Sequence, residues 1–326
     1  MKANERAKLK IQSLTLNETA EVEKGAEIIK RGGLVAFPTE TVYGLGANAL
    51  NAAAVASIYE TKGRPSDNPL ILHVSSVEMA AELVKINDMA IALMEKFWPG
   101  PLSVVLPVYE DKVPPRTRGG LDTAAVRMPD AAIALALIEK SGIPIAAPSA
   151  NISGRPSPTD AETIRREIGK KIPLVIDGGE TKFGVESTVV DLTGKNAVIL
   201  RPGGVSKEML EAALAAKVLL PQDQNIIKRS PGTRYRHYAP LLPLRLCKAG
   251  DTPKDNGNWA WIGTSHPSGN PKVKVLFQNT GEYAKELFRT LRKLEESGTE
   301  IIYAEIPDDK GIGSALKDRL IRAAGE

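Results

Sequence analysis

The sequence has 326 residues and a mass of 35.0 kDa, which is more than one average domain and predicts a large domain plus a smaller one. With 42% hydrophobic and 25% charged residues and a mean hydropathy of −0.16, the composition is that of a globular protein. No stretch approaches the roughly 18 uninterrupted apolar residues of a membrane span, so a soluble protein is expected. The N-terminal segment lacks the apolar run of a signal peptide, and Cys247 is the only cysteine, which favours a reducing, cytoplasmic setting.

The net charge of +4 is concentrated in one short segment. Residues 1–220 hold 26 Lys and Arg against 26 Asp and Glu, and residues 241–326 hold 13 against 12. Residues 221–240 hold four basic residues and one acidic residue, together with Tyr235 and His237. Because Pro and Gly punctuate this segment, it is predicted to be an extended interdomain linker. A solvated spacer is one interpretation, but the interleaved basic and aromatic residues favour stacking and phosphate contact.

Apolar runs alternate with helix-like segments through residues 1–220. A helix is expected at 18–31, ended by Gly32 and Gly33, and a strand at 34–37 is followed by a polar loop, PTETVYGLGAN. Further strands are expected at 70–74, 102–107, 123–128, 143–148, 173–177, 187–192 and 197–201. Further helices are expected at 52–60, 89–97, 131–140 and 159–169, the last with Thr159 and Glu162 as a capping box. This order predicts an α/β fold with a large, twisted, mixed sheet flanked by helices.

The tail has an alternation of its own. Strands are expected at 259–263, 272–277 and 300–306, with a helix between Thr280 and Gly298 and a last helix in GIGSALKDRLIRAA. Strand, helix, strand and helix in so short a segment predict a small, Rossmann-like, parallel α/β domain. The expected domains are therefore 1–220 and 241–326, joined by the linker at 221–240.

Common nucleotide and metal signatures are weak in this sequence. No GxxxxGK(S/T) phosphate loop occurs. A GxGxxA pattern at Gly44, Gly46 and Ala49 does not follow its strand directly, as a dinucleotide-binding turn would. The three histidines lie far apart without the spacing of metal ligands, so no structural zinc site is expected.

Polar and cationic residues gather at the ends of most of the predicted strands and in the loops beside them. They are Thr41, Lys62, Arg64, Asn68, His73, Arg127, Ser149, Asn151, Ser157, Ser187 and Arg201. Each has an ordinary structural explanation: Lys62 and Arg64 in a solvated loop, His73 in the core, Ser149 and Asn151 in a cap or turn. Together they would give one end of the sheet several cations and many hydroxyls, which is what an anionic small molecule requires.

Nine motifs in order carry a family resemblance that runs from about residue 15 to the end of the chain. They are GLVAFPTETVYGLG, KGRPSDNPLILHV, FWPGPLSVVL, AVRMP, APSANISGRPSPT, ESTVVDL, ILRPGG, SPGTRYRHYAP and the tail KGIGSALKDRLIRAA. The first seven resemble the YrdC-type threonylcarbamoyl-AMP synthases, and the last two resemble the long, two-domain form of that family. Thr233 departs from the linker motif, where an apolar residue, usually Met, is expected.

The resemblance implies a nucleotidyltransferase that condenses L-threonine, bicarbonate and ATP to threonylcarbamoyl-adenylate and pyrophosphate. The adenylate would supply the tRNA threonylcarbamoyl transfer machinery, which modifies an adenosine in certain tRNAs. Mg²⁺ is implied with ATP and would be held by phosphate oxygens and water, since the motifs offer no acidic pair for a metal cage. Stable nucleic-acid binding is not expected.

The resemblance also implies the roles of individual residues. Lys62 and Arg64 would be catalytic, and Arg127 would pair with the threonine carboxylate. The threonine-binding set is Thr41, His73, Arg127, Ser149 and Ser187. The ATP-binding set is Lys62, Arg64, Asn68, Thr123, Asn151, Ser157, Arg201, Tyr235 and His237, of which the last two would close over the nucleotide.

Two other functions stay open from the sequence alone. The basic linker beside a cationic surface could bind RNA directly, in which case binding would weaken steeply with salt and need no ATP. The same strand-end residues could instead serve a hydrolase or transferase of a carbamoyl or acyl phosphate.

Overall fold

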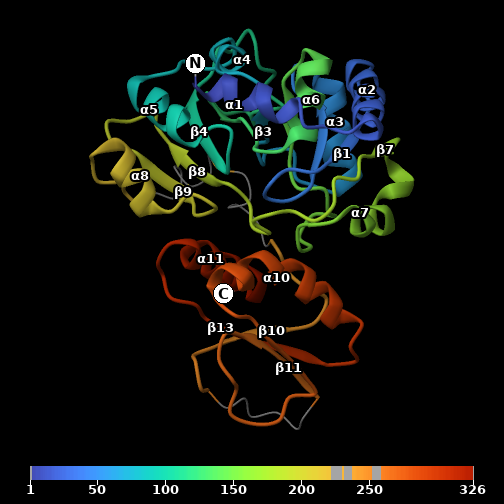
Figure 1. The fold of residues 1–326 in the computed structure, drawn as a ribbon, viewed down its shortest axis with the longest axis vertical. Coiled ribbons are helices and arrows are strands. Elements are labelled where there is room, and N and C mark those ends of the chain that lie inside the picture. The colour runs from blue at the N-terminus through green and yellow to red at the C-terminus, as the bar shows by residue number, and fades with distance from the viewer. Residues whose placement is uncertain (1, 222–229, 231–236, 252–257, 326) are drawn as a thin grey trace.

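The computed structural model describes residues 2–221, 230, 237–251 and 258–325, and Figure 1 shows them as two stacked lobes. Its helices are α1 (Lys2–Ile11), α2 (Leu16–Lys30), α3 (Ala52–Lys62), α4 (Val77–Ala81), α5 (Asp88–Phe97), α6 (Ala132–Ser141), α7 (Ala161–Glu167), the 3-10 helix η1 (Gly169–Lys171), α8 (Lys207–Leu214), α10 (Thr280–Glu295) and α11 (Ile312–Ala324). None of the helices in these ranges is long and apolar enough to cross a membrane.

The first lobe is built on a nine-stranded mixed sheet. Its strands are β1 (Val35–Phe37), β2 (Gly44–Asn48), β3 (Ile71–His73), β4 (Leu102–Pro107), β5 (Thr123–Arg127), β6 (Ile145–Ala147), β7 (Leu174–Val175), β8 (Thr188–Asp191) and β9 (Val198–Arg201). They lie in the order β7-β1-β2-β6-β3-β5-β4-β8-β9. The parallel pairs are β7 with β1, β3 with β5 and β4 with β8, and the other neighbours are antiparallel. The predicted mixed sheet is therefore confirmed.

Strand β2 was not expected, because it falls in the segment interpreted as a polar loop. Its glycines permit close packing: a Cβ on Gly46 would come within 2.7 Å of both the Phe37 ring and the Ile145 side chain. Gly44 also faces the Phe37 ring. Gly44 and Gly46 therefore belong to a strand that packs against aromatic and aliphatic neighbours, and not to a dinucleotide-binding turn.

The expected capping box at the start of α7 is also wrong, by one residue. Asp160 is the N-cap, and its Oδ1 accepts a hydrogen bond from the backbone N–H of Thr163 at 2.7 Å. Thr159 lies outside the helix, where its carbonyl accepts the N–H of Thr181. Sequence analysis also missed α1, α4, α8 and the first strand of the tail, β10.

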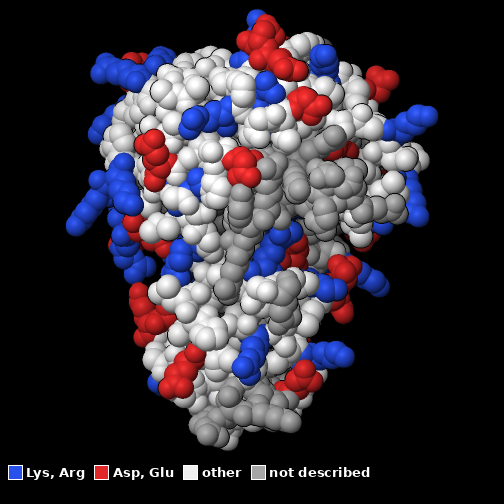
Figure 2. All heavy atoms as spheres, turned by 180° about the vertical axis from the view of Figure 1, so that it is seen from behind, with Lys and Arg blue, Asp and Glu red and all other residues white. Residues whose placement is uncertain are grey.

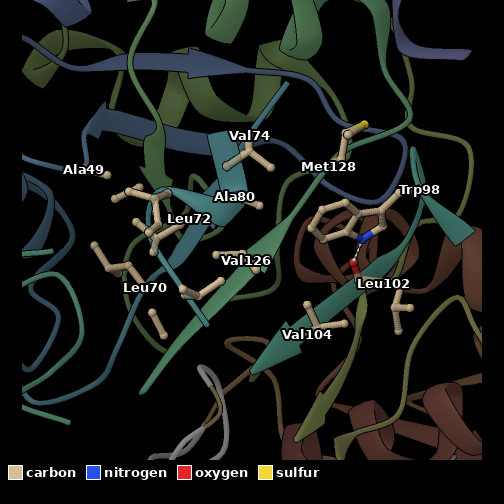
Figure 3. Packing of buried hydrophobic residues seen from close by; sticks show 14 of the residues in the cluster. Ala49, Leu70, Leu72, Val74, Ala80, Trp98, Leu102, Val104, Val126 and Met128 are labelled. Atoms are coloured by element: carbon tan, nitrogen blue, oxygen red, sulfur yellow. Dashed lines mark hydrogen bonds between the residues drawn. The ribbon is translucent and has the colours of Figure 1, made fainter. Parts of the chain in front are cut away.

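The main core of the first lobe lies between the sheet and its helices, and Figure 3 shows part of it. Trp98 is fully buried there. Its indole Nε1–H donates to the carbonyl of Leu102 at 2.8 Å, at the start of β4. This bond fixes the large ring against β4, which lies between β5 and β8 in the sheet.

We expect Trp98→Phe to lower the free energy of unfolding by about 1–3 kcal/mol, because a buried hydrogen bond and part of the ring volume are lost. Denaturant unfolding of the full chain measures this difference. Tyr109→Phe is the control, because Tyr109 is 39% exposed and its change should stay within about 0.5 kcal/mol. Equal effects of the two substitutions would contradict the assignment.

The second lobe contains a parallel sheet, as predicted, but with four strands where three were expected. Its strands are β10 (Leu244–Cys247), β11 (Trp259–Gly263), β12 (Val273–Leu276) and β13 (Ile301–Glu305), in the order β10-β13-β11-β12. Figure 1 shows α10 and α11 on the side of this sheet that faces the first lobe. The two helices therefore form the tail's contact surface with the large domain.

Ion pairs join the two lobes. Arg155 makes two hydrogen bonds to Glu295, at 2.8 and 2.6 Å, and Arg292 pairs with Glu167. The two lobes also make apolar contacts. Val42 and Val185 of the first lobe belong to the same buried cluster as Leu287 and Leu316 of the tail. The exposed pairs at this junction are Arg166 with Glu296 and Arg289 with Glu180.

Candidate functional site

A cavity of about 60 Å³ lies where the loops at one end of the large sheet converge on the end of the linker. The predicted site residues that line it are Thr41, Arg64, His73, Arg127, Ser149, Asn151, Ser187, Arg201 and His237. They come from segments far apart in the sequence. The fold thus brings together most of the residues that the motifs singled out.

Four other predicted residues do not line this cavity. Lys62, Asn68, Thr123 and Ser157 are all buried in the first lobe. Tyr235 and the atypical Thr233 lie outside the described residues.

Sheet register places the first pair of site residues. His73 and Arg127 end the parallel neighbours β3 and β5, and they are register partners. The guanidinium of Arg127 lies 2.7 Å from the Glu40 carboxylate and donates to Thr41 Oγ1 at 3.1 Å. Glu40 is 4% exposed, so this is a buried ion pair behind the cavity wall. Sequence analysis missed Glu40, although it lies within the quoted PTET motif.

A second cationic group is fixed on the other side of the cavity. Arg201, at the end of β9, donates to the carbonyl of Ser187 at 2.8 Å and to its Oγ at 3.1 Å. Ser187 Oγ also lies 2.9 Å from Ser103 Oγ. Burial, opposed in part by nearby Tyr238, lowers the pKa of Arg201. The hydroxyl of Ser187 is thereby held in a network that connects two strands.

Lys62 supports the cavity wall from behind. Its ammonium group donates to the carbonyl of Ser149 at 2.6 Å and to the carbonyl of Asn151. Burial, and next to it the charge of Arg64, holds the pKa of Lys62 well below its ordinary value. Because both carbonyls belong to cavity-lining residues, Lys62 fixes the loop that follows β6.

Several buried polar atoms have no hydrogen-bond partner within the described part of the chain. They include both polar side-chain atoms of Asn68 (Oδ1 and Nδ2), Thr123 Oγ1, Arg64 Nε, His73 Nδ1 and His237 Nε2. Buried polar atoms are nearly always paired, so a group of orphans among the residues singled out by the motifs indicates a polar ligand. Burial lowers the pKa of Arg64 to about 10, which leaves it cationic at neutral pH.

The two histidines of the site are neutral at physiological pH. Burial, with the charge of Arg127 nearby, lowers the pKa of His73 to about 3. Burial, with the charge of Arg64, lowers that of His237 to about 3 as well. A neutral imidazole has one acceptor nitrogen, so each ring can accept a hydrogen bond from a ligand N–H or O–H.

These depressed pKa values predict a pH dependence of stability. Between pH 6.5 and 3 the unfolded chain protonates His73 while the folded chain does not, so stability falls as the pH falls through that window. In the parent, His73 should lower the free energy of unfolding by about 1.4 kcal/mol for each pH unit below its unfolded pKa. Between pH 7 and pH 5 we therefore expect His73→Gln to lose roughly 2 kcal/mol less of its free energy of unfolding than the parent loses. Denaturant unfolding at the two pH values measures this.

His266→Gln is the matched control, since His266 is exposed in the tail. Its loss between the two pH values should equal that of the parent. Parallel profiles for the parent and His73→Gln would refute the assignment.

Acidic and basic residues that sequence analysis missed complete the site. Glu186 and Arg155 both line the cavity. Glu186 accepts a hydrogen bond from Ser157 Oγ at 2.5 Å, which places the predicted Ser157 one contact behind the lining. Both residues lie in quoted motifs, ESTVVDL and APSANISGRPSPT, but without the fold nothing in the sequence distinguishes them from solvated charges.

Comparisons with known proteins show which family the chain belongs to. The Sua5/YciO/YrdC family model, described as Telomere recombination, matches residues 27–203, and a model described as Threonylcarbamoyl-AMP synthase, C-terminal domain, matches residues 205–325. The chain is 42% identical to a threonylcarbamoyl-AMP synthase of Bacillus subtilis, over 94% of this chain and 93% of the other. It is 44% identical to one of Pyrococcus abyssi, over 94% and 95%.

A solved structure matches both lobes. The crystal structure of P. abyssi Sua5 complexed with L-threonine superposes with a TM-score of 0.87 at 44% identity, covering 94% of this chain and 95% of that one. The chain therefore belongs to the Sua5/YciO/YrdC family, in the two-domain form shared by the threonylcarbamoyl-AMP synthases of B. subtilis and P. abyssi.

Proposed function

We propose that this protein is a threonylcarbamoyl-AMP synthase, which condenses L-threonine, bicarbonate and ATP to threonylcarbamoyl-adenylate and pyrophosphate. The observation that carries the proposal is the single cavity where the threonine and ATP sets meet, with Arg64, Arg127 and Arg201 in its lining. Three guanidinium groups suit a reaction whose substrates carry a carboxylate, a triphosphate and a carbonate.

The chemistry needs positioning more than a covalent enzyme nucleophile. The neutral amine of threonine attacks the carbon of bicarbonate, or of carbon dioxide formed from it by loss of hydroxide. An N–C bond forms, a C–O bond of bicarbonate breaks, and the hydroxide released takes the amine proton and leaves as water. An oxygen of the resulting carbamate then attacks the α-phosphorus of ATP, and the bond to pyrophosphate breaks. Negative charge builds up in both steps, so fixed cations and a close approach of the reactants supply the catalysis.

The geometry supports a division of the cavity into two halves. On the threonine side are Thr41, His73, Arg127, Ser149 and Ser187, and we propose that Arg127, oriented by Glu40, binds the substrate carboxylate. On the ATP side are Arg64, Asn151, Arg201 and His237, with Asn68, Thr123 and Ser157 behind them. Arg64 would stabilise charge on the phosphates, while Lys62 would act by fixing the loop at 149–151.

The size of the cavity supports closure over the nucleotide. Its volume of about 60 Å³ is far below the roughly 300–1,000 Å³ of ordinary ligand pockets. His237 and Tyr238 form part of its wall, so their displacement would admit ATP and their return would exclude water. A mixed anhydride hydrolyses readily, which makes exclusion of water useful.

Magnesium is proposed as the companion of ATP. Within the described ranges no three His, Cys, Asp or Glu side chains cluster as a metal site, so the described residues offer no cage of their own. Phosphate oxygens and water would then supply its ligands. We also propose that the product passes to the cytoplasmic machinery that transfers the threonylcarbamoyl group to tRNA.

Direct RNA binding is the second function left open by the sequence. Figure 2 shows positive and negative side chains interspersed over one face of the molecule, as on an ordinary soluble surface. No observation favours RNA binding as the primary role over the synthase.

The deciding experiment is a mass spectrum of the product formed from ATP, L-threonine and bicarbonate. We expect threonylcarbamoyl-adenylate, and pyrophosphate release that requires both threonine and bicarbonate. Release of phosphate without threonine would favour the hydrolase or transferase alternative. RNA binding that is steeply salt-dependent, without any product, would favour the binding module.

A further inference from the structure

Arg319 is a charged residue of the tail that is buried completely, at 0% exposure, on α11. Its guanidinium group points out of the tail domain and contacts residues of the first lobe. Nε donates to Glu186 Oε2 at 2.7 Å, and one Nη donates to the carbonyl of Pro202 at 3.0 Å. The other Nη is held by Asp318 of the same helix. A positive charge that is buried away from water at a domain junction destabilises the folded state unless its hydrogen-bonding groups are paired. The contacts of Arg319 therefore fix the position of its guanidinium group.

The first contact leads directly to the cavity. Glu186 lines the cavity and uses its two oxygens separately, one for Arg319 and one for Ser157 Oγ. Burial alone would raise the pKa of Glu186, but the charges of Arg319 and Arg201 lower it, so the carboxylate stays ionised. An ionised acceptor fixes the direction of the Ser157 hydroxyl.

A further contact of Arg319, with the ring of Tyr238, connects it to the end of the linker. The Arg319 guanidinium carbon lies 5.2 Å from the centre of the Tyr238 ring, and that ring stacks on Phe288 of α10 at 5.2 Å and 24°. Tyr238 has a φ of 67°, in the left-handed region that a tyrosine rarely adopts, so its neighbours must hold it there. Tyr238 and the adjacent His237 both line the cavity. The two tail helices therefore hold the end of the linker against the site.

We propose that Arg319 is a positioning residue of the synthase reaction, through which the tail domain sets the ATP half of the cavity. It acts on Glu186 and Ser157 on one side and on Tyr238 and His237 on the other. The proposal rests on the proposed function, because Ser157 and His237 are assigned to ATP by that function. It gives the tail an indirect part in catalysis, although no tail residue lines the cavity in the described part of the chain.

Arg319→Lys is the principal test. Lysine keeps the positive charge but can make neither the forked contact to Glu186 and Pro202 nor the flat contact with Tyr238. We expect the KM for ATP to rise by about tenfold or more, which corresponds to the loss of one charge-assisted contact. The KM for threonine should change by less than about threefold. Initial rates of pyrophosphate release by the full chain, with each substrate varied in turn, give both values.

Arg289→Ala is the matched control. It also removes an ion pair between the lobes, Arg289 with Glu180 at 2.6 Å, but that pair is exposed and touches no cavity residue. All kinetic constants should stay within about twofold of the parent. If Arg319→Lys leaves the KM for ATP unchanged, or if Arg289→Ala raises it equally, Arg319 serves only to join the domains and the proposal fails.

A second variant covers the case in which Arg319→Lys does not fold. In Glu186→Gln/Arg319→Met the two charges of the buried pair are removed together, and Asp318 keeps its ion pair with Arg322. The amide can still accept from Ser157, while the support of Tyr238 is lost. We expect this variant to fold and to keep a raised KM for ATP, and a parental value would overturn the proposal. Failure of the parent chain itself to form the adenylate would refute the proposed function instead.

Discussion

Arg127→Ala should weaken threonine binding by about 10- to 150-fold, because a charge-assisted pair to a carboxylate contributes about 1.5–3 kcal/mol. ATP binding should change little. The same substitution should lower the free energy of unfolding by about 3–5 kcal/mol, since it leaves the buried Glu40 carboxylate without its partner. Isothermal calorimetry with threonine and with ATP, together with denaturant unfolding, measures the three effects.

A double variant separates the two roles of Arg127. Glu40→Gln/Arg127→Ala removes both buried charges, so most of the lost stability should return while threonine binding stays weak. If binding recovers together with stability, Arg127 is only a structural partner of Glu40. Equal loss of threonine and ATP affinity in the single variant would also contradict the assignment.

The second large effect is expected on removal of the tail. A chain ending at residue 220 should fold, because the whole nine-stranded sheet and its main core lie within residues 1–220. It should bind threonine within about tenfold of the parent, since the entire threonine set is retained. Adenylate synthesis should fall by at least about a hundredfold, because His237 and Tyr238 are removed and Glu186 loses Arg319.

Addition of the separate tail should not restore synthesis. In the intact chain the linker supplies a high effective concentration of the tail, and a separate tail at micromolar concentration does not match it. Calorimetry with threonine and assays of pyrophosphate release on the two chains test this. Unchanged synthesis by the shorter chain would show that the linker is the solvated spacer, and the domain boundaries at 220 and 241 would then have no catalytic meaning.

The sheet was largely predictable because its strands are short runs of Val, Ile, Leu and Ala. Strand β4 is found at the predicted residues, and most others differ by one or two residues at their ends. Strand β2 escaped because GLGAN contains two glycines, which disfavour a strand unless a ring such as Phe37 covers them. That cover comes from another strand and cannot be found from local propensity.

The site was predictable where polar residues follow strands in recognisable motifs. Lys62, Asn68 and Ser157 belong to the same motifs, yet the fold places them behind the lining, because a motif does not specify which side chains reach the cavity surface. Arg319 lies in the quoted tail motif KGIGSALKDRLIRAA, but nothing in the sequence distinguishes it there from the neighbouring charged residues. It lies in an ordinary amphipathic helix, and its role depends on docking against Glu186, 133 residues earlier in the chain.

Because the two lobes share one buried apolar cluster, local opening of one lobe affects the packing of the other. Val42, which follows the site residue Thr41, packs in the same cluster as the tail's Tyr283 and Leu291. Any fluctuation that separates α10 from the first lobe therefore uncovers Val42 and loosens the backbone beside Thr41. Threonine bound beside Thr41, as proposed above, should therefore slow amide hydrogen exchange in α10. By the same linkage, the tail's stability is part of the free energy with which the amino acid binds.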